Sequence, residues 1–161
     1  MLFDYTDAQT GKDTLALINQ LISDMAGWQN PLPLEEELAL AFAQDMIWWG
    51  PEGIGATYTI PRYAKQHASV FRAAFYERSK VNHLARLAEG YYGGFCGYPN
   101  FTVKHKGGFM GYPASDKIGE FRVIDIYRRN QDNKLAENWV FIDLLHWLKT
   151  AGFALPEGLS K

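Results

Sequence analysis

The stretch that decides the fold runs from His105 to Gly152 and reads HKGGFMGYPASDKIGEFRVIDIYRRNQDNKLAENWVFIDLLHWLKTAG. Apolar residues alternate over 118–129 and again over 135–142, with a polar turn between them, which predicts two paired antiparallel strands. An amphipathic segment follows from 143 to 151 and predicts a short closing helix. Two long strands closed by a helix would form one wall of a cone-shaped pocket, so polar side chains inside that wall are the candidates for chemistry.

Upstream of this stretch, apolar residues at helical spacing predict three helices. The first begins near Asp13, which can cap it, and ends near Gly27. The second covers 35–46 and opens with three glutamates, which the helix dipole favours in a first turn. The third begins at Thr59, which is followed closely by a proline, and reaches about Arg78.

The remaining segments are predicted as loops and short strands. Residues 48–55 alternate tryptophan, glycine and proline and are predicted to form a loop at the cavity mouth, and 81–105 is predicted as successive short strands. Helices followed by a strand meander indicate an α+β fold with a curved, cone-shaped antiparallel sheet packed against three N-terminal helices. We expect a single domain over 1–161, with a helical part (12–78), a sheet part (81–142) and the closing helix (143–151).

Length, charge and cysteine content narrow the class of protein. A chain of 161 residues is one domain by length and can bury a sizeable core. A net charge of -2 without a cluster of basic residues argues against nucleic-acid binding. The lone Cys96 cannot form an internal disulfide, and no paired-cysteine metal motif exists, so we expect no metal site and a reducing compartment. We expect no signal peptide, no membrane span and a cytoplasmic location.

Aromatic residues make up 15% of the chain, with five Trp, nine Tyr and ten Phe. Rings add contact area at little entropic cost and therefore suit the lining of an apolar cavity. Additional bulk in an ordinary core is the alternative interpretation.

The order of motifs in the C-terminal part resembles the SnoaL-like polyketide cyclase family, which belongs to the nuclear transport factor 2-like superfamily. The resemblance rests on an H-x-G-x-x-x-G-x-P pattern from His105, a strand ending in Tyr127 and an arginine, a strand carrying Trp139, and an Asp-Leu-Leu sequence from Asp143 before the last helix. It is carried chiefly by residues 101–152.

SnoaL-like cyclases close a polyketide ring by an intramolecular aldol step and use no metal or organic cofactor. Strand against strand, the family's catalytic aspartate falls at Val140 and the histidine of the preceding strand falls at Asp125, so polyketide cyclisation does not transfer directly. Asp143 matches the family's aspartate before the last helix, but its spacing suits a helix cap. The resemblance also implies a homodimer formed through the outer face of the sheet.

Asp125 is the leading candidate for an acid/base role. It lies inside the otherwise apolar strand segment V-I-D-I-Y. A carboxyl group there must be neutralised, hydrogen-bonded or turned toward a polar cavity, because an unpaired buried charge is very costly. Burial would raise its pKa, whereas a neighbouring Arg122 or Arg128 would lower it. An ion pair on the outer face of the sheet is the alternative.

Two histidines are candidates for the second catalytic group. Strand alternation places His105 on the same face as Val103 and opposite the two flanking lysines, so it is expected to face inward; a surface histidine is the alternative. His67 lies on the apolar stripe of the third helix with Tyr63 and Phe71. A histidine that packs in the core without a catalytic role is the alternative there.

The candidate ligand-binding residues are Trp48, Tyr58, Tyr63, Phe71, Asn138 and Val140. Trp48 offers a stacking surface, and Tyr58 offers a hydroxyl to a ligand oxygen, although both can serve packing alone. Asn138 is expected to pair with Asp125 as one polar spot, and a purely structural hydrogen bond is the alternative.

Two functions remain open. The first is cofactor-free acid/base chemistry, such as cyclisation, isomerisation or dehydration, on a small, largely apolar metabolite that carries a carbonyl or hydroxyl group. In this hypothesis Asp125 is the base and His105 or His67 the donor. The second is a non-catalytic ligand-binding or dimerisation module of the same fold.

Overall fold

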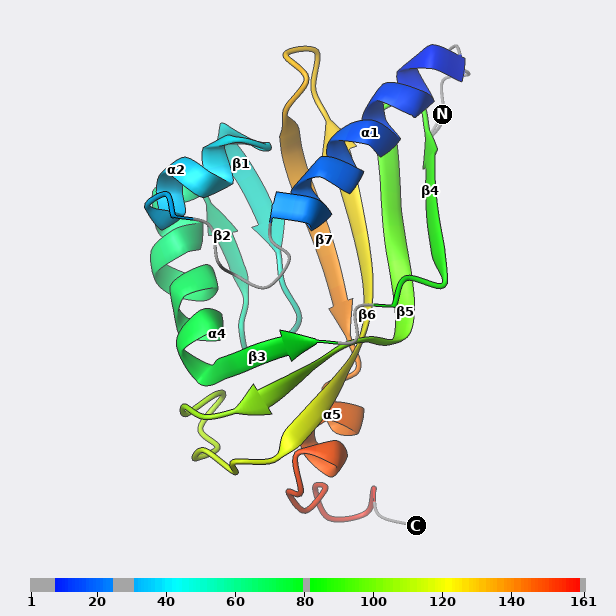
Figure 1. Cartoon of the computed structure of the whole chain (residues 1–161). Coiled ribbons are helices and arrows are strands. Elements are labelled where there is room, and N and C mark those ends of the chain that lie inside the picture. The colour runs from blue at the N-terminus through cyan, green and yellow to red at the C-terminus, as the bar shows by residue number, and fades with distance from the viewer. Residues whose placement is uncertain (1–7, 25–30, 80–81, 160–161) are drawn as a thin grey trace.

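The structure is a computed structural model that describes residues 8–24, 31–79 and 82–159. A curled sheet forms its centre, and helices pack on it from several sides (Figure 1). The sheet has the strand order β2-β1-β7-β6-β5-β3, and β4 pairs with β5. The predicted α+β class is confirmed.

The bounds of the elements are as follows. The strands are β1 (Phe42–Trp49), β2 (Ala56–Tyr58), β3 (Phe75–Ser79), β4 (Ala85–Glu89), β5 (Tyr92–His105), β6 (Ile118–Arg129) and β7 (Leu135–Ile142). The helices are α1 (Ala8–Asp24), α2 (Leu34–Ala39), α3 (Ile60–Tyr63), the π-helical turn η2 (Ala64–Ala68), α4 (Ser69–Ala74) and α5 (Leu144–Thr150).

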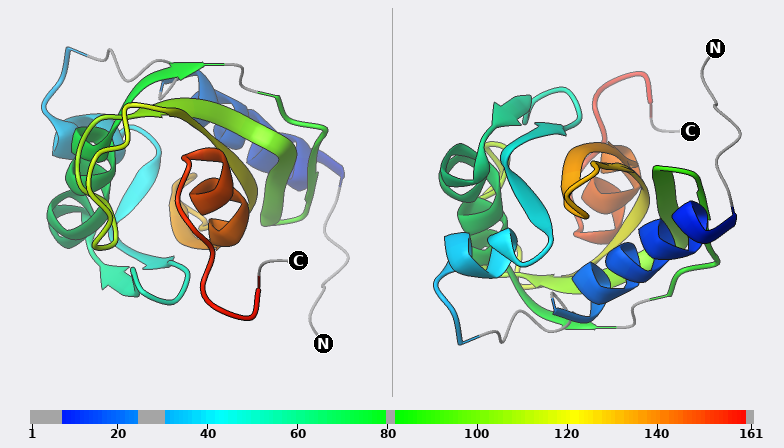
Figure 2. Two further views of the ribbon diagram at one scale, coloured as in Figure 1. Left: turned by 90° about the horizontal axis from the view of Figure 1, so that it is seen from below. Right: turned by 90° about the horizontal axis from the view of Figure 1, so that it is seen from above.

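The sheet curls strongly along its width, as the views from its two ends show (Figure 2). Helix α1 lies across β4 and β5, and it is fixed there by polar contacts. The Thr14 hydroxyl donates to the Gly90 carbonyl at 2.6 Å, and Arg129 Nε donates to the same hydroxyl oxygen at 2.9 Å. The long β5 and β6 reach past β4 and β7, and there β3 pairs with β5 and α5 packs on β6 (Figure 1).

The apolar interior has two parts. One lies between α1, the α3–α4 region and the upper sheet and includes Phe42, Met46, Trp48, Tyr63 and Tyr127. The other lies under α5 and includes Phe75, Phe101, Phe121, Val123 and Trp147. Val140 packs against both parts, so the middle of β7 marks the junction between them.

The predicted second helix is wrong over most of its length. Helix α2 ends at Ala39, and Phe42 begins strand β1, which includes the two tryptophans expected in a loop. Strand β1 has a hydrogen-bonded neighbour on each side, β2 and β7. These ladder bonds and the burial of alternate side chains such as Met46 and Trp48 outweigh a local sequence that also suits a helix.

The third helix ends earlier than predicted. Its helical part stops at Ala74, and Phe75 takes an extended conformation that opens β3. Phe75 pairs with His105 on β5 and is completely buried, so packing in the lower core ends the helix. Val70 of α4 is 46% exposed. The expected helical part 12–78 therefore also carries β1, β2 and β3.

The sheet is not wholly antiparallel. Strand β1 runs parallel to β7, while the other strand pairs are antiparallel. Residues 92–105, predicted as separate short strands, form the single strand β5, whose pairing with β6 shifts register between Gly97 and Phe101. The first half of β5 pairs with β4 and the second half with β3.

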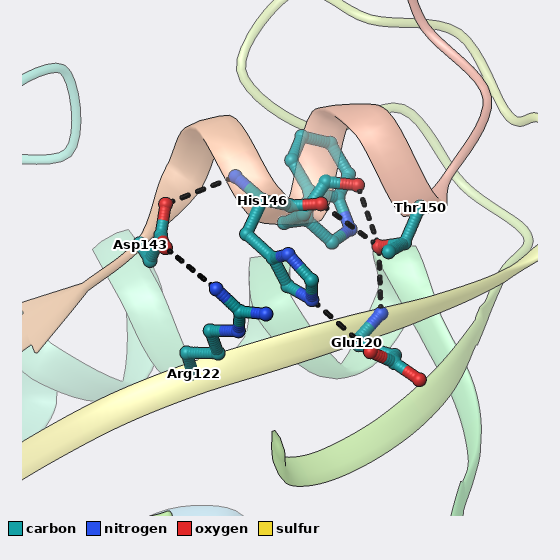
Figure 3. A network of polar contacts seen from close by, with 6 residues as sticks. Glu120, Arg122, Asp143, His146 and Thr150 are labelled. Carbon is teal, nitrogen blue, oxygen red and sulfur yellow. Dashed lines mark hydrogen bonds and ion pairs between the residues drawn. The ribbon is translucent and has the colours of Figure 1, made fainter. Parts of the chain in front are cut away.

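Polar contacts hold the closing helix α5 on β6 (Figure 3). Asp143 accepts a hydrogen bond from the backbone amide of His146 at 3.0 Å, which confirms its predicted role as a helix cap. The His146 imidazole contacts Glu120 at 3.0 Å, and Arg122 lies 3.7 Å from the Asp143 carboxylate. These groups fix α5 and take no part in the candidate site.

Candidate functional site

A cavity of about 120 Å³ opens where the two parts of the core meet. Its walls come from α1, β1, the α3–α4 region, β3 and the inner faces of β5, β6 and β7. The lining residues used below are Trp48, Tyr63, His67, Phe71, Arg72, Arg78, Phe95, Asn100, Phe101, Asp125, Tyr127, Asn138 and Val140.

Asp125 faces this cavity from the middle of β6. Strand alternation turns Val123, Asp125 and Tyr127 inward, whereas Ile124 and Ile126 are exposed on the outer face. The Asp125 residue is only 9% exposed. The alternative of an outer-face ion pair is therefore excluded for this carboxyl group.

The carboxyl group of Asp125 has hydrogen-bond partners on two sides. Asn138 Nδ2 donates to its Oδ1 at 3.2 Å and to the Ile126 carbonyl at 3.2 Å, so the predicted Asp125–Asn138 pairing is present. The Tyr127 side chain is the second partner. Burial raises the pKa of Asp125 to about 6, although the Asn138 bond, the Arg78 charge and the Tyr127 bond oppose the rise.

Two buried tyrosines border the carboxyl group. Burial raises the pKa of both Tyr63 and Tyr127 above the ordinary range, and the nearby Asp125 charge adds to the rise. Both phenols therefore remain protonated at physiological pH. They present hydroxyl groups, which can donate hydrogen bonds to a carboxylate or to a ligand oxygen.

His67 enters the cavity from the helical wall. It lies in the π-helical turn η2, and its ring stacks on Trp48 at 4.0 Å between centroids with the planes 19° apart. Burial lowers the pKa of His67 to about 4, so the imidazole is neutral at pH 7. The Trp48 indole lies so close to Gly50 that a Cβ there would overlap its ring.

Two arginines reach the cavity, and neither was predicted for the site. Arg72 is held by Glu37 of α2 through two hydrogen bonds of 2.8 and 2.9 Å. Arg78 on β3 places its guanidinium 4.4 Å from the centre of the Phe101 ring, and its charge acts on Asp125. Burial lowers the pKa of Arg78, and the Asp125 charge opposes this.

Asn100 is a further cavity residue that the sequence analysis missed. It is 1% exposed, and its Oδ1 has no hydrogen-bond partner among the described residues. The sequence carries no signal for it, because Asn100 lies within the register shift between Gly97 and Phe101 of β5.

Of the predicted site residues, the structure brings most to one place. The cavity is lined by Trp48, Tyr63, His67, Phe71, Asp125, Asn138 and Val140. These residues line one cavity whether or not any of them is catalytic.

His105 does not belong to this group. It is fully buried in the lower core, its Nδ1 lies 3.2 Å from the Ser115 hydroxyl, and its ring packs on Phe75 and Trp147. On β5 it is ten residues from Phe95, the partner of Asp125, which is roughly 30 Å along the strand. The inward orientation of His105 was predicted correctly, but its position along the sheet, away from the cavity, was not.

Tyr58 is also outside the cavity. It lies on the short edge strand β2, is 47% exposed and packs edge-on against Trp49. Its partner across the ladder is Ile47 of β1. It belongs to the outer surface, because Thr57 and not Tyr58 is the buried residue of β2.

The predicted ion-pair partners of Asp125 are engaged elsewhere. Arg128 pairs with Glu137 at 2.7 Å and Arg122 with Asp143 at 3.7 Å. Within the described part of the chain, no group of three or more His, Cys, Asp or Glu side chains is arranged to hold a metal ion. None of the described helices is long and apolar enough to span a membrane.

Solved structures decide the fold. A candidate SnoaL-like polyketide cyclase from Jannaschia sp. CCS1 superposes with a TM-score of 0.72 at 16% identity, covering 95% of this chain and 100% of its own. The chain has the fold of these SnoaL-like and NTF2-like proteins. The resemblance stated from the sequence is confirmed at the level of fold.

Other proteins with the SnoaL-like fold carry different names. IdmH from Streptomyces antibioticus, a candidate polyketide cyclase, has a TM-score of 0.61 at 18% identity over 88% of this chain and 97% of its own. AclR from Streptomyces galilaeus, a candidate hydroxylase, has a TM-score of 0.66 at 18% identity over 90% and 98%. No family model and no curated protein matches the chain.

Proposed function

We propose that the cavity binds a small, largely apolar metabolite bearing a carbonyl or hydroxyl group and performs acid/base chemistry on it without a cofactor. The observation that carries this proposal is Asp125, a carboxyl group in an apolar cavity whose pKa of about 6 lies close to neutrality. A base with such a pKa is mostly ionised at pH 7 and still accepts a proton readily. Structural relatives named as polyketide cyclases support a fold suited to small molecules.

The residues around the carboxylate supply the remaining parts of such a reaction. Asp125 would take a proton from a carbon next to the ligand carbonyl. The negative charge that develops on the carbonyl oxygen would be stabilised by the hydroxyl group of Tyr63, the guanidinium of Arg78, or the neutral imidazole of His67. Returning the proton from Asp125 to another carbon would give isomerisation, and returning it to a β-hydroxyl group, which then leaves as water, would give dehydration.

The substitution Asp125→Asn tests this proposal. Native mass spectrometry of freshly purified protein would first identify a retained ligand, and turnover of that ligand would then be followed. We expect Asp125→Asn to abolish turnover while circular dichroism and ligand binding are retained. Turnover at the wild-type rate in Asp125→Asn would refute the assignment.

A non-catalytic role is favoured by one specific observation. Asp125 is already hydrogen-bonded by Asn138 and Tyr127, which is how a structural buried carboxyl group is satisfied. In that case the protein would bind the metabolite as a carrier or sensor. Saturable binding that survives Asp125→Asn, without conversion of the retained ligand by the wild type, would favour this alternative.

We also propose that the outer face of the sheet pairs with a second copy of the chain. Exposed apolar side chains continue across neighbouring strands, namely Trp49, Tyr92, Ile124, Ile126 and Phe141. Arg128 and Glu137 neutralise each other on this face, so two copies can meet there without repulsion between like charges. Light scattering should give a dimer that Phe141→Lys converts to a folded monomer, and a monomeric wild type would refute the pairing.

A further inference from the structure

The cavity is small for a fold whose relatives are named after polyketides. Its volume is about 120 Å³. An apolar cavity of about 150 Å³ in a protein core takes up a molecule of benzene. The space beside Asp125 is therefore about the size of one six-membered ring.

The walls of the cavity are made largely of rings. The sheet contributes Phe42, Trp48, Phe95, Phe101 and Tyr127, and the helical side contributes Tyr63, His67 and Phe71. These side chains also pack on one another, with Phe71 and Phe101 edge-to-face at 6.4 Å and Trp48 stacked on His67. Since each ring is held by its neighbours, enlarging the space requires several of them to move together.

One polar group of the cavity, Asn100 Oδ1, has no hydrogen-bond donor among the described residues, and a ligand could supply one. Asn100 is 1% exposed, and its Oδ1 lacks a partner in the part of the chain that the structure describes. A buried acceptor without a partner costs about 1–3 kcal/mol, which a hydroxyl group on the ligand would recover. Space for this side chain depends on Gly97, because a Cβ there would stand 2.6 Å from Asn100 Oδ1.

The Asn138 amide, by contrast, is not available to the ligand in the same way. Its Nδ2 donates to both Asp125 and the Ile126 carbonyl. Asn138 therefore orients the Asp125 carboxyl group, and Asn100 is the asparagine that can hydrogen-bond the ligand.

We infer that the ligand group held in this cavity is a single six-membered ring with a hydroxyl substituent that donates to Asn100 Oδ1. This inference rests on the proposed function only in taking the cavity as the ligand site, and it requires no turnover. A fused polycyclic ring system exceeds the volume of about 120 Å³.

Binding of four simple probes tests the inference on the full-length protein. We would titrate phenol, toluene, cyclohexanol and 2-naphthol into the protein and follow backbone amide shifts by NMR. Phenol and cyclohexanol should bind, toluene should bind about tenfold more weakly because it lacks the donor, and 2-naphthol at least tenfold more weakly than phenol because of its second ring. Equal or tighter binding of 2-naphthol by the wild type would overturn the size limit.

Two variants assign the selectivity to named residues. Asn100→Leu keeps the volume but removes the acceptor, so phenol and toluene should then bind about equally. Phe71→Ala removes a ring from the wall, so 2-naphthol should gain affinity relative to phenol. If thermal unfolding shows that Phe71→Ala is not folded, Val140→Ala enlarges the same space more gently. Unchanged selectivity in Asn100→Leu would overturn the hydroxyl assignment.

The outcomes separate this inference from the proposed chemistry. Selective binding of single rings without any turnover would refute the catalytic proposal and leave the ligand class intact. Asp125-dependent turnover of a polycyclic ligand would refute the single-ring inference and support the catalytic proposal. Failure of all four probes to shift the amides of the cavity residues would refute both.

Discussion

Asn138 Nδ2 lies 3.2 Å from Asp125 Oδ1, and the two residues sit diagonally across the strand pair β6–β7. The Asp125 backbone is opposite Val140, and Asn138 is opposite Tyr127, so one amide reaches the carboxyl group of the next inward-facing pair. This bond favours the ionised carboxylate, while burial favours the protonated form. The balance between these two effects sets the protonation state of the Asp125 carboxyl group.

The first prediction concerns the pH dependence of turnover. Asp125 must be ionised to act as a base, so kcat/KM should fall as pH drops through about 6. Asn138→Leu removes a hydrogen bond to the ionised form and should move this limb of the profile to higher pH. A limb that stays in place in Asn138→Leu would show that another group controls it.

The second prediction concerns stability. The folded-state pKa of Asp125 is raised from 3.8 to about 6, so the folded protein binds a proton that the unfolded chain releases in this window. The contribution of Asp125 to the free energy of unfolding is therefore fully present below pH 3.8 and is lost as pH rises through about 6, by roughly 3 kcal/mol in all.

Urea unfolding of the wild type and Asp125→Asn at several pH values measures this contribution. Because Asn does not titrate, the stability of the wild type relative to Asp125→Asn should decline as pH rises from 3.8 through about 6 and level off well above it. A difference that is independent of pH would contradict the raised pKa.

The third prediction separates the two roles of His67. His67→Phe keeps a ring to stack on Trp48 but removes both nitrogen atoms. If the neutral imidazole donates to the ligand, ligand affinity should change little and kcat should fall about 10²-fold or more. If His67 only packs, kcat should remain within a few-fold of the wild-type value, and the donor must be either Tyr63 or Arg78.

The fourth prediction concerns the wall of the cavity. Glu37 has a side chain only 2% exposed and is bound by Arg72 of α4 at 2.8 Å, so the pair ties α2 to the α3–α4 region. Glu37→Gln leaves the Arg72 guanidinium without its ion-pair partner. The substitution should therefore destabilise the protein by about 3 kcal/mol.

A double-mutant cycle with Arg72→Met gives the matched control. Because Arg72→Met removes the stranded cation, Glu37→Gln should cost much less in that background. Equal costs in both backgrounds would show that the two side chains are not coupled.

Much of the C-terminal half was predictable because local and tertiary signals agree there. The alternation in β6 places Asp125 among inward apolar residues and fixes its face, and the Asp143 cap follows from its spacing to the helix. The Asp125–Asn138 contact followed from the same alternation on β7.

The N-terminal half was less predictable because strand pairing overrides local preference there. Residues 42–46 suit a helix by composition, yet they form β1 because β7 offers a parallel partner from the far end of the chain. No local pattern records that partner.

The site residues that were missed or misplaced share a geometric cause. His105 and Asp125 both face inward, but alternation says nothing about how far apart they lie along a curled sheet. Arg78 and Asn100 enter the cavity through β3 and the register shift in β5, neither of which has a sequence signature.

The protonation of Asp125 can be observed directly by carbon-detected NMR of its side-chain carboxyl group during a pH titration of the wild type. The account predicts a midpoint near 6, well above that of an exposed aspartate, with a further rise in Asn138→Leu. A midpoint below 4 would mean that Asp125 is an ordinary ionised carboxylate and would contradict the central claim.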